Sequence, residues 1–228
     1  MQAFIKNLCA ILLLCCGLLS CSEDNNTTEE YPNWQQTNEA YFNNLYTEVQ
    51  QRIAAGDTSW KIIRKWSLEN SVHLNPDDHV IAHVISEGTG TTRPLYSDTV
   101  YVHYQGRLLP STSYPTGYVF DKTWLNEYNA ETMRPVKLGV SQTATPSTSA
   151  YGTVSYQYSS NIDGFTTVLM EMHEGDRWEV YIPYALGYGT EDKSGSIPAF
   201  STLIFDLTLV SCHHAGETVP TYQAKQLW

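Results

Sequence analysis

The 228-residue sequence has few basic residues and few cysteines, and each shortage excludes a class of protein. Its 13 Lys and Arg stand against 24 Asp and Glu, which gives a formal net charge of −11. Nucleic-acid binding depends on clustered positive charge, so we expect no nucleic-acid partner. Cys9, Cys15, Cys16 and Cys21 lie at the N-terminus, and beyond them only Cys212 follows. The chain after residue 21 therefore cannot form an internal disulfide.

The sequence also lacks a membrane-length apolar run and a recognisable metal-ligand spacing. The apolar run at residues 8–19 is shorter than the roughly 20 residues that cross a bilayer. The seven histidines are scattered along the chain, and although His79 and His83 are four apart, they fall in a segment that we predict as strand rather than helix. We therefore expect neither a metal nor a cofactor.

The N-terminus has the layout of a cleaved leader. Residues 1–20 carry Lys6, then the apolar run, and end at Ser20 before Cys21, an order typical of a signal peptide. The segment LLSC at residues 18–21 resembles a bacterial lipobox, in which the cysteine receives a lipid and cleavage occurs just before it. We predict lipidation of Cys21; an ordinary secretory signal with a chance cysteine is the alternative.

The residues after Cys21 predict a flexible tether and an envelope location. Residues 21–32 are polar and acidic without apolar periodicity, as expected of a linker. The acidic start of this stretch, residues 22–24, resembles the tract that directs some Bacteroidetes lipoproteins to the cell surface. We expect a lipid-anchored protein of the cell envelope, at the outer membrane, on either its periplasmic face or the cell surface.

A helical segment is predicted over residues 33–77. Apolar side chains recur at helical spacing over residues 34–53, and Gly56 provides a stop. A second short apolar element follows at residues 60–66. The first helix either pairs with another copy of the chain or covers the sheet of its own chain, so the oligomeric state stays open.

After Asn75 the apolar period changes from that of a helix to that of a strand. The alternation predicts strands near residues 79–85, 99–108, 177–183 and 202–210, with one short helix at residues 164–172. We predict an α+β fold in which a mostly antiparallel sheet wraps around that helix. Residues 110–117 and 141–160 are predicted as insertions that form loops or a hairpin, and residues 213–228 as a C-terminal tail.

Four segments, in this order, resemble the motifs of the FKBP-type peptidyl-prolyl isomerases. They are VYVHYQGRL (100–108), VFDKT (119–123), IDGFTTVLMEMHEGDRWEVYIP (162–183) and LGYGTEDKSGSIPAFSTLIFDLTLV (186–210). With the strand near residue 79, the resemblance covers residues 78–212. It implies an FKBP-like half-wrapped antiparallel sheet around a short helix, with an aromatic pocket that receives proline.

The resemblance also implies the residues of that pocket. Tyr104, Asp121 and Tyr188 take the catalytic positions. The substrate-binding positions fall on Phe120, Ile162, Phe165, Ile197 and Phe205. Two positions depart from the family pattern, since Phe165 stands where members usually have Trp, and Arg134 stands near the place of a second wall aromatic.

The activity that the resemblance implies is cis-trans isomerisation of X-Pro bonds in exported polypeptides, without a nucleophile or a metal. The barrier is the loss of amide resonance, roughly 18–20 kcal/mol, so catalysis requires selective binding of the twisted bond. An apolar aromatic pocket that removes water disfavours the planar, more charge-separated amide. The alternative function is a catalytically weak, chaperone-like module that binds a peptide or a protein.

Overall fold

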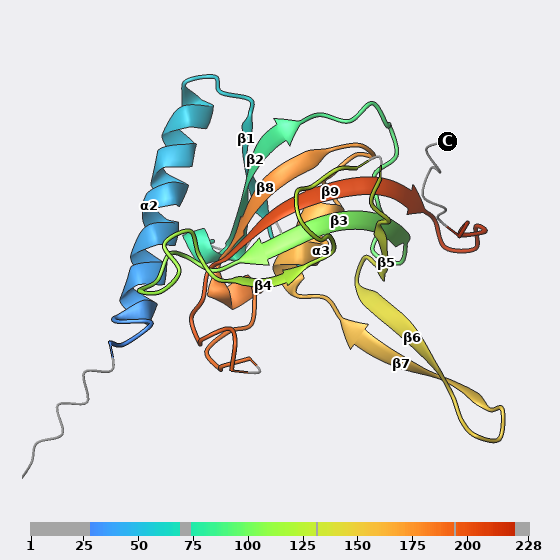
Figure 1. Cartoon of the computed structure of the whole chain (residues 1–228). Coiled ribbons are helices and arrows are strands. Elements are labelled where there is room, and N and C mark those ends of the chain that lie inside the picture. Colours follow the sequence, from blue (N-terminus) through green and yellow to red (C-terminus); the bar gives the residue numbers. More distant parts are fainter. Residues whose placement is uncertain (1–27, 69–73, 131, 194, 222–228) are drawn as a thin grey trace, which may run out of the picture.

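The computed structural model describes residues 28–68, 74–130, 132–193 and 195–221 (Figure 1). The predicted signal peptide, Cys21, most of the predicted tether and the end of the predicted tail lie outside the described residues. Within the described residues, no helix has the length and apolarity needed to cross a membrane.

The core of the fold is a seven-stranded antiparallel sheet (Figure 1). Its strands run in the spatial order β1-β2-β8-β9-β3-β4, and β5 pairs with the other half of β3. Alternating apolar residues and β-branched residues favour these extended segments. The strands are β1 (Trp60–Arg64), β2 (His79–Ser86), β3 (Thr99–Arg107), β4 (Val119–Lys122), β5 (Val136–Gly139), β8 (Arg177–Ile182) and β9 (Leu203–His213).

A short helix, α3 (Asp163–Leu169), packs against the sheet, and its side chains join the main apolar core. Gly164 allows this close approach, because a Cβ at that position would collide with the side chain of Ile182 on β8. The predicted arrangement of an antiparallel sheet around one short helix is therefore confirmed.

The predicted N-terminal helix is also present, as α2 (Trp34–Ala54). It covers its own sheet, lying beside β1 (Figure 1). Two of its side chains fasten it to the residues before β9: the indole N–H of Trp34 donates to Ser201 Oγ at 2.8 Å, and the backbone N–H of Thr202 donates to Asn38 Oδ1 at 2.7 Å. The buried Asn38 was not distinguished from the exposed polar residues in the sequence.

The segment predicted as helical over residues 33–77 is only partly helical. Residues Trp60–Arg64 form the edge strand β1, which pairs with β2 along its whole length. The physical reason lies in its composition, since Trp60, Ile62 and Ile63 favour an extended backbone, and their side chains add apolar groups to both faces of the sheet beside β2. A short 3-10 helix, η1 (Pro76–Asp78), leads into β2, and a second, η2 (Tyr184–Leu186), follows β8.

The inserted residues 141–160 form a hairpin, one of the two predicted alternatives. Strands β6 (Gln142–Thr148) and β7 (Val154–Ser160) make a separate two-stranded sheet. The hairpin projects away from the body of the molecule, on the side opposite α2 in Figure 1. Because β7 leads directly into α3, the base of the hairpin lies next to the start of that helix.

Candidate active site

The eight residues predicted for the pocket converge on one cavity between α3 and the sheet. The cavity has a volume of about 330 Å³, within the range of pockets that hold small ligand groups. Three further residues line it that the sequence analysis did not identify: Leu138, Ser160 and Asn161. The full lining consists of Tyr104, Phe120, Asp121, Leu138, Ser160, Asn161, Ile162, Phe165, Tyr188, Ile197 and Phe205.

Phe205, on β9, is the centre of the aromatic lining. Its ring centroid lies 5.2 Å from that of Phe165, 5.6 Å from that of Phe120 and 6.1 Å from that of Tyr104. All three pairs are edge-to-face, which is a favourable arrangement for aromatic quadrupoles. Four elements of the fold (β3, β4, α3 and β9) thus each contribute one ring to an apolar surface.

Gly106 on β3 makes room for this cluster. A Cβ at position 106 would collide with the rings of both Phe120 and Phe205. The glycine lies two residues after Tyr104, on the same face of the strand. The aromatic lining therefore depends on a residue that has no side chain of its own.

The polar side of the cavity is formed by Tyr104, Asp121 and Tyr188. The hydroxyl of Tyr104 donates to Asp121 Oδ2 at 2.7 Å. Burial and this hydrogen bond both raise the pKa of Tyr104, and burial followed by the charge of Asp121 raises the pKa of Tyr188. Both phenols therefore stay protonated at neutral pH; the proton of Tyr104 is engaged by Asp121.

The Tyr188 hydroxyl has no hydrogen-bond partner within the described part of the chain, so it is free to donate to a bound group. Tyr188 lies in the loop after η2 and faces the cavity together with Ile197. Lys193 Nζ lies 5.9 Å from the centroid of the Tyr188 ring, a distance at which a cation is attracted to an aromatic face.

Hydrogen bonds hold the N-terminal end of α3 in place. Ile162 is the N-cap residue with an extended backbone (φ −65°, ψ 145°), and its carbonyl accepts from the amides of Phe165 and Thr166. The side-chain amide of Asn161 donates to the carbonyls of Gly139 at 2.8 Å and Val140 at 3.0 Å. These bonds connect the hairpin base to the strand end beside it and fix the backbone at the rim of the cavity.

The wall next to Asn161 is aliphatic. Leu138 of β5 lines the cavity at this side, whereas Arg134, which stands near the place of the expected aromatic, does not. The sequence alone could not identify Leu138 as a pocket residue. A single leucine in a four-residue strand has no distinctive pattern, and its position beside the cavity follows only from the pairing of β5 with β3. Ser160 was assigned to the end of the insertion at residues 141–160, and Asn161, which follows it, was given no role.

The sequence is similar to those of known proteins. The family model of the FKBP-type peptidyl-prolyl cis-trans isomerases matches residues 90–210. The chain is 33% identical over 133 residues to "Macrophage infectivity potentiator" of Trypanosoma cruzi, covering 58% of this chain and 53% of the relative. It is 33% identical over 133 residues to "Outer membrane protein MIP" of Legionella longbeachae, covering 58% and 44%.

A solved structure, a peptidyl-prolyl cis-trans isomerase from Pseudomonas syringae pv. tomato, matches with a TM-score of 0.44 and 21% identity over 77% of this chain and 96% of that one. The chain spans about half the length of the two relatives named above.

An antiparallel sheet wrapped around one short helix, with an aromatic pocket between them, is a fold of the FKBP class. The family match covers more than half of the sequence. The chain therefore belongs to the FKBP-type peptidyl-prolyl cis-trans isomerase family.

Proposed function

We propose that this chain catalyses cis-trans isomerisation of X-Pro bonds in exported polypeptides. The observation that carries the proposal is the convergence of all eight predicted residues on one aromatic cavity. Family membership supports the reaction type, and proline-containing polypeptides are the proposed partners.

In the proposed mechanism, the proline ring enters against Phe205, Phe165 and Phe120, which exclude water from the X-Pro amide. Planar amides carry more charge separation than twisted ones, so the loss of water destabilises the planar form relative to the transition state. The Tyr188 hydroxyl and the backbone N–H of Ile162 hold carbonyls of the substrate. Asp121 orients Tyr104, and neither group exchanges a proton with the substrate.

A protease-coupled assay on Xaa-Pro peptides tests this mechanism with two variants of the chain. Tyr188→Phe removes one neutral hydrogen bond to substrate, worth about 0.5–1.5 kcal/mol, so kcat/KM should fall roughly 2- to 10-fold. Asp121→Ala removes the charged partner of Tyr104 and should lower kcat/KM about tenfold or more.

The matched control is Tyr184→Phe, since Tyr184 lies in η2 of the same loop region but does not line the cavity. Tyr184→Phe should retain the activity of the unchanged chain. If the folded chain does not accelerate isomerisation over a panel of Xaa residues, or if all three variants behave alike, catalysis in this pocket is refuted.

We also infer that the protein is anchored to the outer membrane through a lipid on Cys21. The support is the lipobox-like segment 18–21 and the relative named as an outer membrane protein. Labelled fatty acid should be incorporated into the chain during expression and should be absent from Cys21→Ser, which should also leave the membrane fraction. Equal labelling of both would contradict the anchor.

The β6–β7 hairpin supports a second candidate function, a module that binds unfolded peptide. Its turn and second strand expose Tyr151, Val154 and Tyr156, the first of them 97% exposed, and its base lies at the cavity rim. Replacing residues 143–159 by a short Gly-Ser turn should leave activity on tetrapeptides unchanged and reduce activity on an unfolded protein. If the replacement leaves the activity on the unfolded protein as unchanged as the activity on tetrapeptides, the hairpin has no such role.

A further inference from the structure

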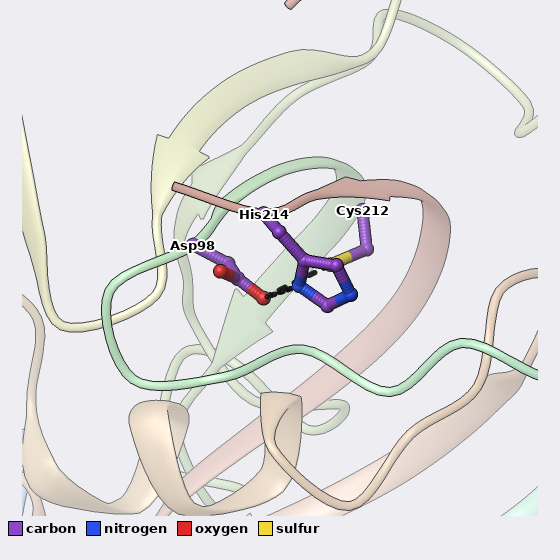
Figure 2. A group of neighbouring side chains, drawn as sticks. All are labelled: Asp98, Cys212 and His214. Atoms are coloured by element: carbon purple, nitrogen blue, oxygen red, sulfur yellow. Dashed lines mark hydrogen bonds and ion pairs between the residues drawn. The ribbon is translucent and has the colours of Figure 1, made fainter. Parts of the chain in front are cut away.

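Three side chains with metal-ligand chemistry meet at the far end of β9 (Figure 2). Asp98 precedes β3, Cys212 is near the end of β9, and His214 follows that strand. His214 Nδ1 lies 2.7 Å from Asp98 Oδ2, and Cys212 Sγ lies 3.5 Å from the same oxygen. All three ligand atoms lie within 4.8 Å of one another. We call these residues the Asp98 cluster; none of them lines the aromatic pocket.

The Asp98 cluster is built into the fold. Asp98 and Cys212 are buried, and His214 is partly exposed, so the group has one side open to solvent. The backbone N–H of Leu95 donates to Asp98 Oδ2 at 2.7 Å, and that of Ala215 donates to Oδ1 at 3.3 Å. Partners of this kind hold a ligating carboxylate in place.

Negative charge surrounds the Asp98 cluster. Glu174 accepts from the backbone N–H of Cys212 at 2.5 Å, and Glu217 accepts from the backbone N–H of His214 at 2.8 Å. Three carboxylates thus lie around one thiol and one imidazole. This surplus of negative charge around the thiol and the imidazole favours a bound cation.

We propose that the Asp98 cluster binds one divalent transition metal of the zinc type, through Cys212 Sγ, His214 Nδ1 and Asp98 Oδ2. Binding releases the thiol proton to solvent and empties Nδ1: its proton leaves to solvent when the ring is an imidazolium, or moves to Nε2 through solvent when the ring is neutral, so that a neutral imidazole protonated at Nε2 binds the metal. The metal takes the place of the hydrogen bonds that these protons make. A water molecule, bound from the side that is open to solvent, is the fourth ligand of the metal. Thiolate and imidazole ligands favour zinc over calcium or magnesium, which prefer oxygen.

One of the three distances between the ligand atoms already fits zinc binding, and the other two can adjust to it. Zinc bonds of 2.0–2.3 Å in a tetrahedron separate the ligand atoms by roughly 3.3–3.8 Å. The sulfur–oxygen distance of 3.5 Å already lies in that range. The nitrogen–oxygen distance of 2.7 Å must lengthen, and the nitrogen and sulfur atoms lie within 4.8 Å of each other. Metal binding therefore includes a rotation of the partly exposed His214 side chain.

Zinc titration of the full chain in mild detergent tests the proposal. His214→Ala and Cys212→Ser should each bind one equivalent fewer, or bind it at least about tenfold more weakly, since losing even a residue behind a ligand costs 10- to 100-fold. His213→Ala is the matched control, because it removes the neighbouring histidine and keeps the cluster. The N-terminal region is the same in every variant, so a difference between variants belongs to the cluster.

Two further readouts remain informative if Cys212→Ser folds poorly. Zinc should raise the melting temperature of the chain and of His213→Ala, but not that of His214→Ala. Cobalt should produce a thiolate-to-metal charge-transfer absorption that weakens in His214→Ala and in Cys212→Ser. Equal zinc uptake by the chain and His214→Ala, or equal loss in His213→Ala, would overturn the proposal.

Discussion

His103 gives the most specific stability prediction, because it is a buried titratable group without a partner. It lies on β3 next to Tyr104, but its ring faces the rings of Trp124 and Tyr128, at centroid distances of 6.5 and 5.4 Å. Neither ring nitrogen has a hydrogen-bond partner among the described residues. Burial lowers the pKa of His103 below its ordinary value.

The direction of the pH effect follows from this lowered pKa. Above pH 6.5, His103 is neutral in both the folded and the unfolded chain, and its contribution to stability is at its maximum. Below pH 6.5 the unfolded chain takes up a proton that the folded chain refuses, so stability falls until the folded pKa is reached. At pH 5.5 the loss is at most about 1.4 kcal/mol, the free energy of one pK unit, or roughly 3–6 °C in melting temperature for a chain of this size.

Urea unfolding of the chain and of His103→Leu at pH 7.5, 6.5 and 5.5 measures this loss directly. The replacement removes the titrating ring and leaves an apolar side chain at the site. The difference in unfolding free energy between the two proteins should change in favour of the variant from pH 7.5 to 5.5, by no more than about 1.4 kcal/mol. His214, whose pKa is raised by Asp98, acts in the opposite direction but is common to both proteins and cancels. A difference that is constant across this range would refute the reasoning.

Two other substitutions test the packing. Gly106→Ala places a Cβ against the rings of Phe120 and Phe205. It should lower the free energy of unfolding in urea by about 1–3 kcal/mol, as overpacking does. It should also lower isomerase activity more than Tyr188→Phe does, because Tyr188→Phe leaves these rings in place. Asn38→Ala leaves the backbone N–H of Thr202 without its buried partner, which should cost about 1–3 kcal/mol while kcat/KM on peptides stays unchanged. A Gly106→Ala protein of full stability, or an Asn38→Ala protein of unchanged stability, would contradict the packing described.

The spacing of apolar residues was sufficient to predict the helices and strands that bury one face. The helix α2 and the strands β3, β8 and β9 lie where their apolar spacing predicted them. Periodicity was insufficient for Trp60–Arg64, because five residues with apolar side chains on both sides of the backbone fit a turn of helix as well as an edge strand. Only the pairing with β2 distinguishes these two conformations.

The pocket residues could be predicted from the sequence, whereas the Asp98 cluster could not. The pocket residues lie in long, recognisable segments, so a resemblance predicts each of them together with its neighbours. Asp98 and Cys212 are 114 residues apart, and each alone has a common structural explanation, a turn residue and a buried thiol. Cys212 and His214 are separated by one residue, but two potential ligands at the end of a strand do not define a site, and the sequence analysis did not single them out. Asp98 lies beside these two residues only because β3 and β9 pair antiparallel, which places the start of β3 next to the end of β9.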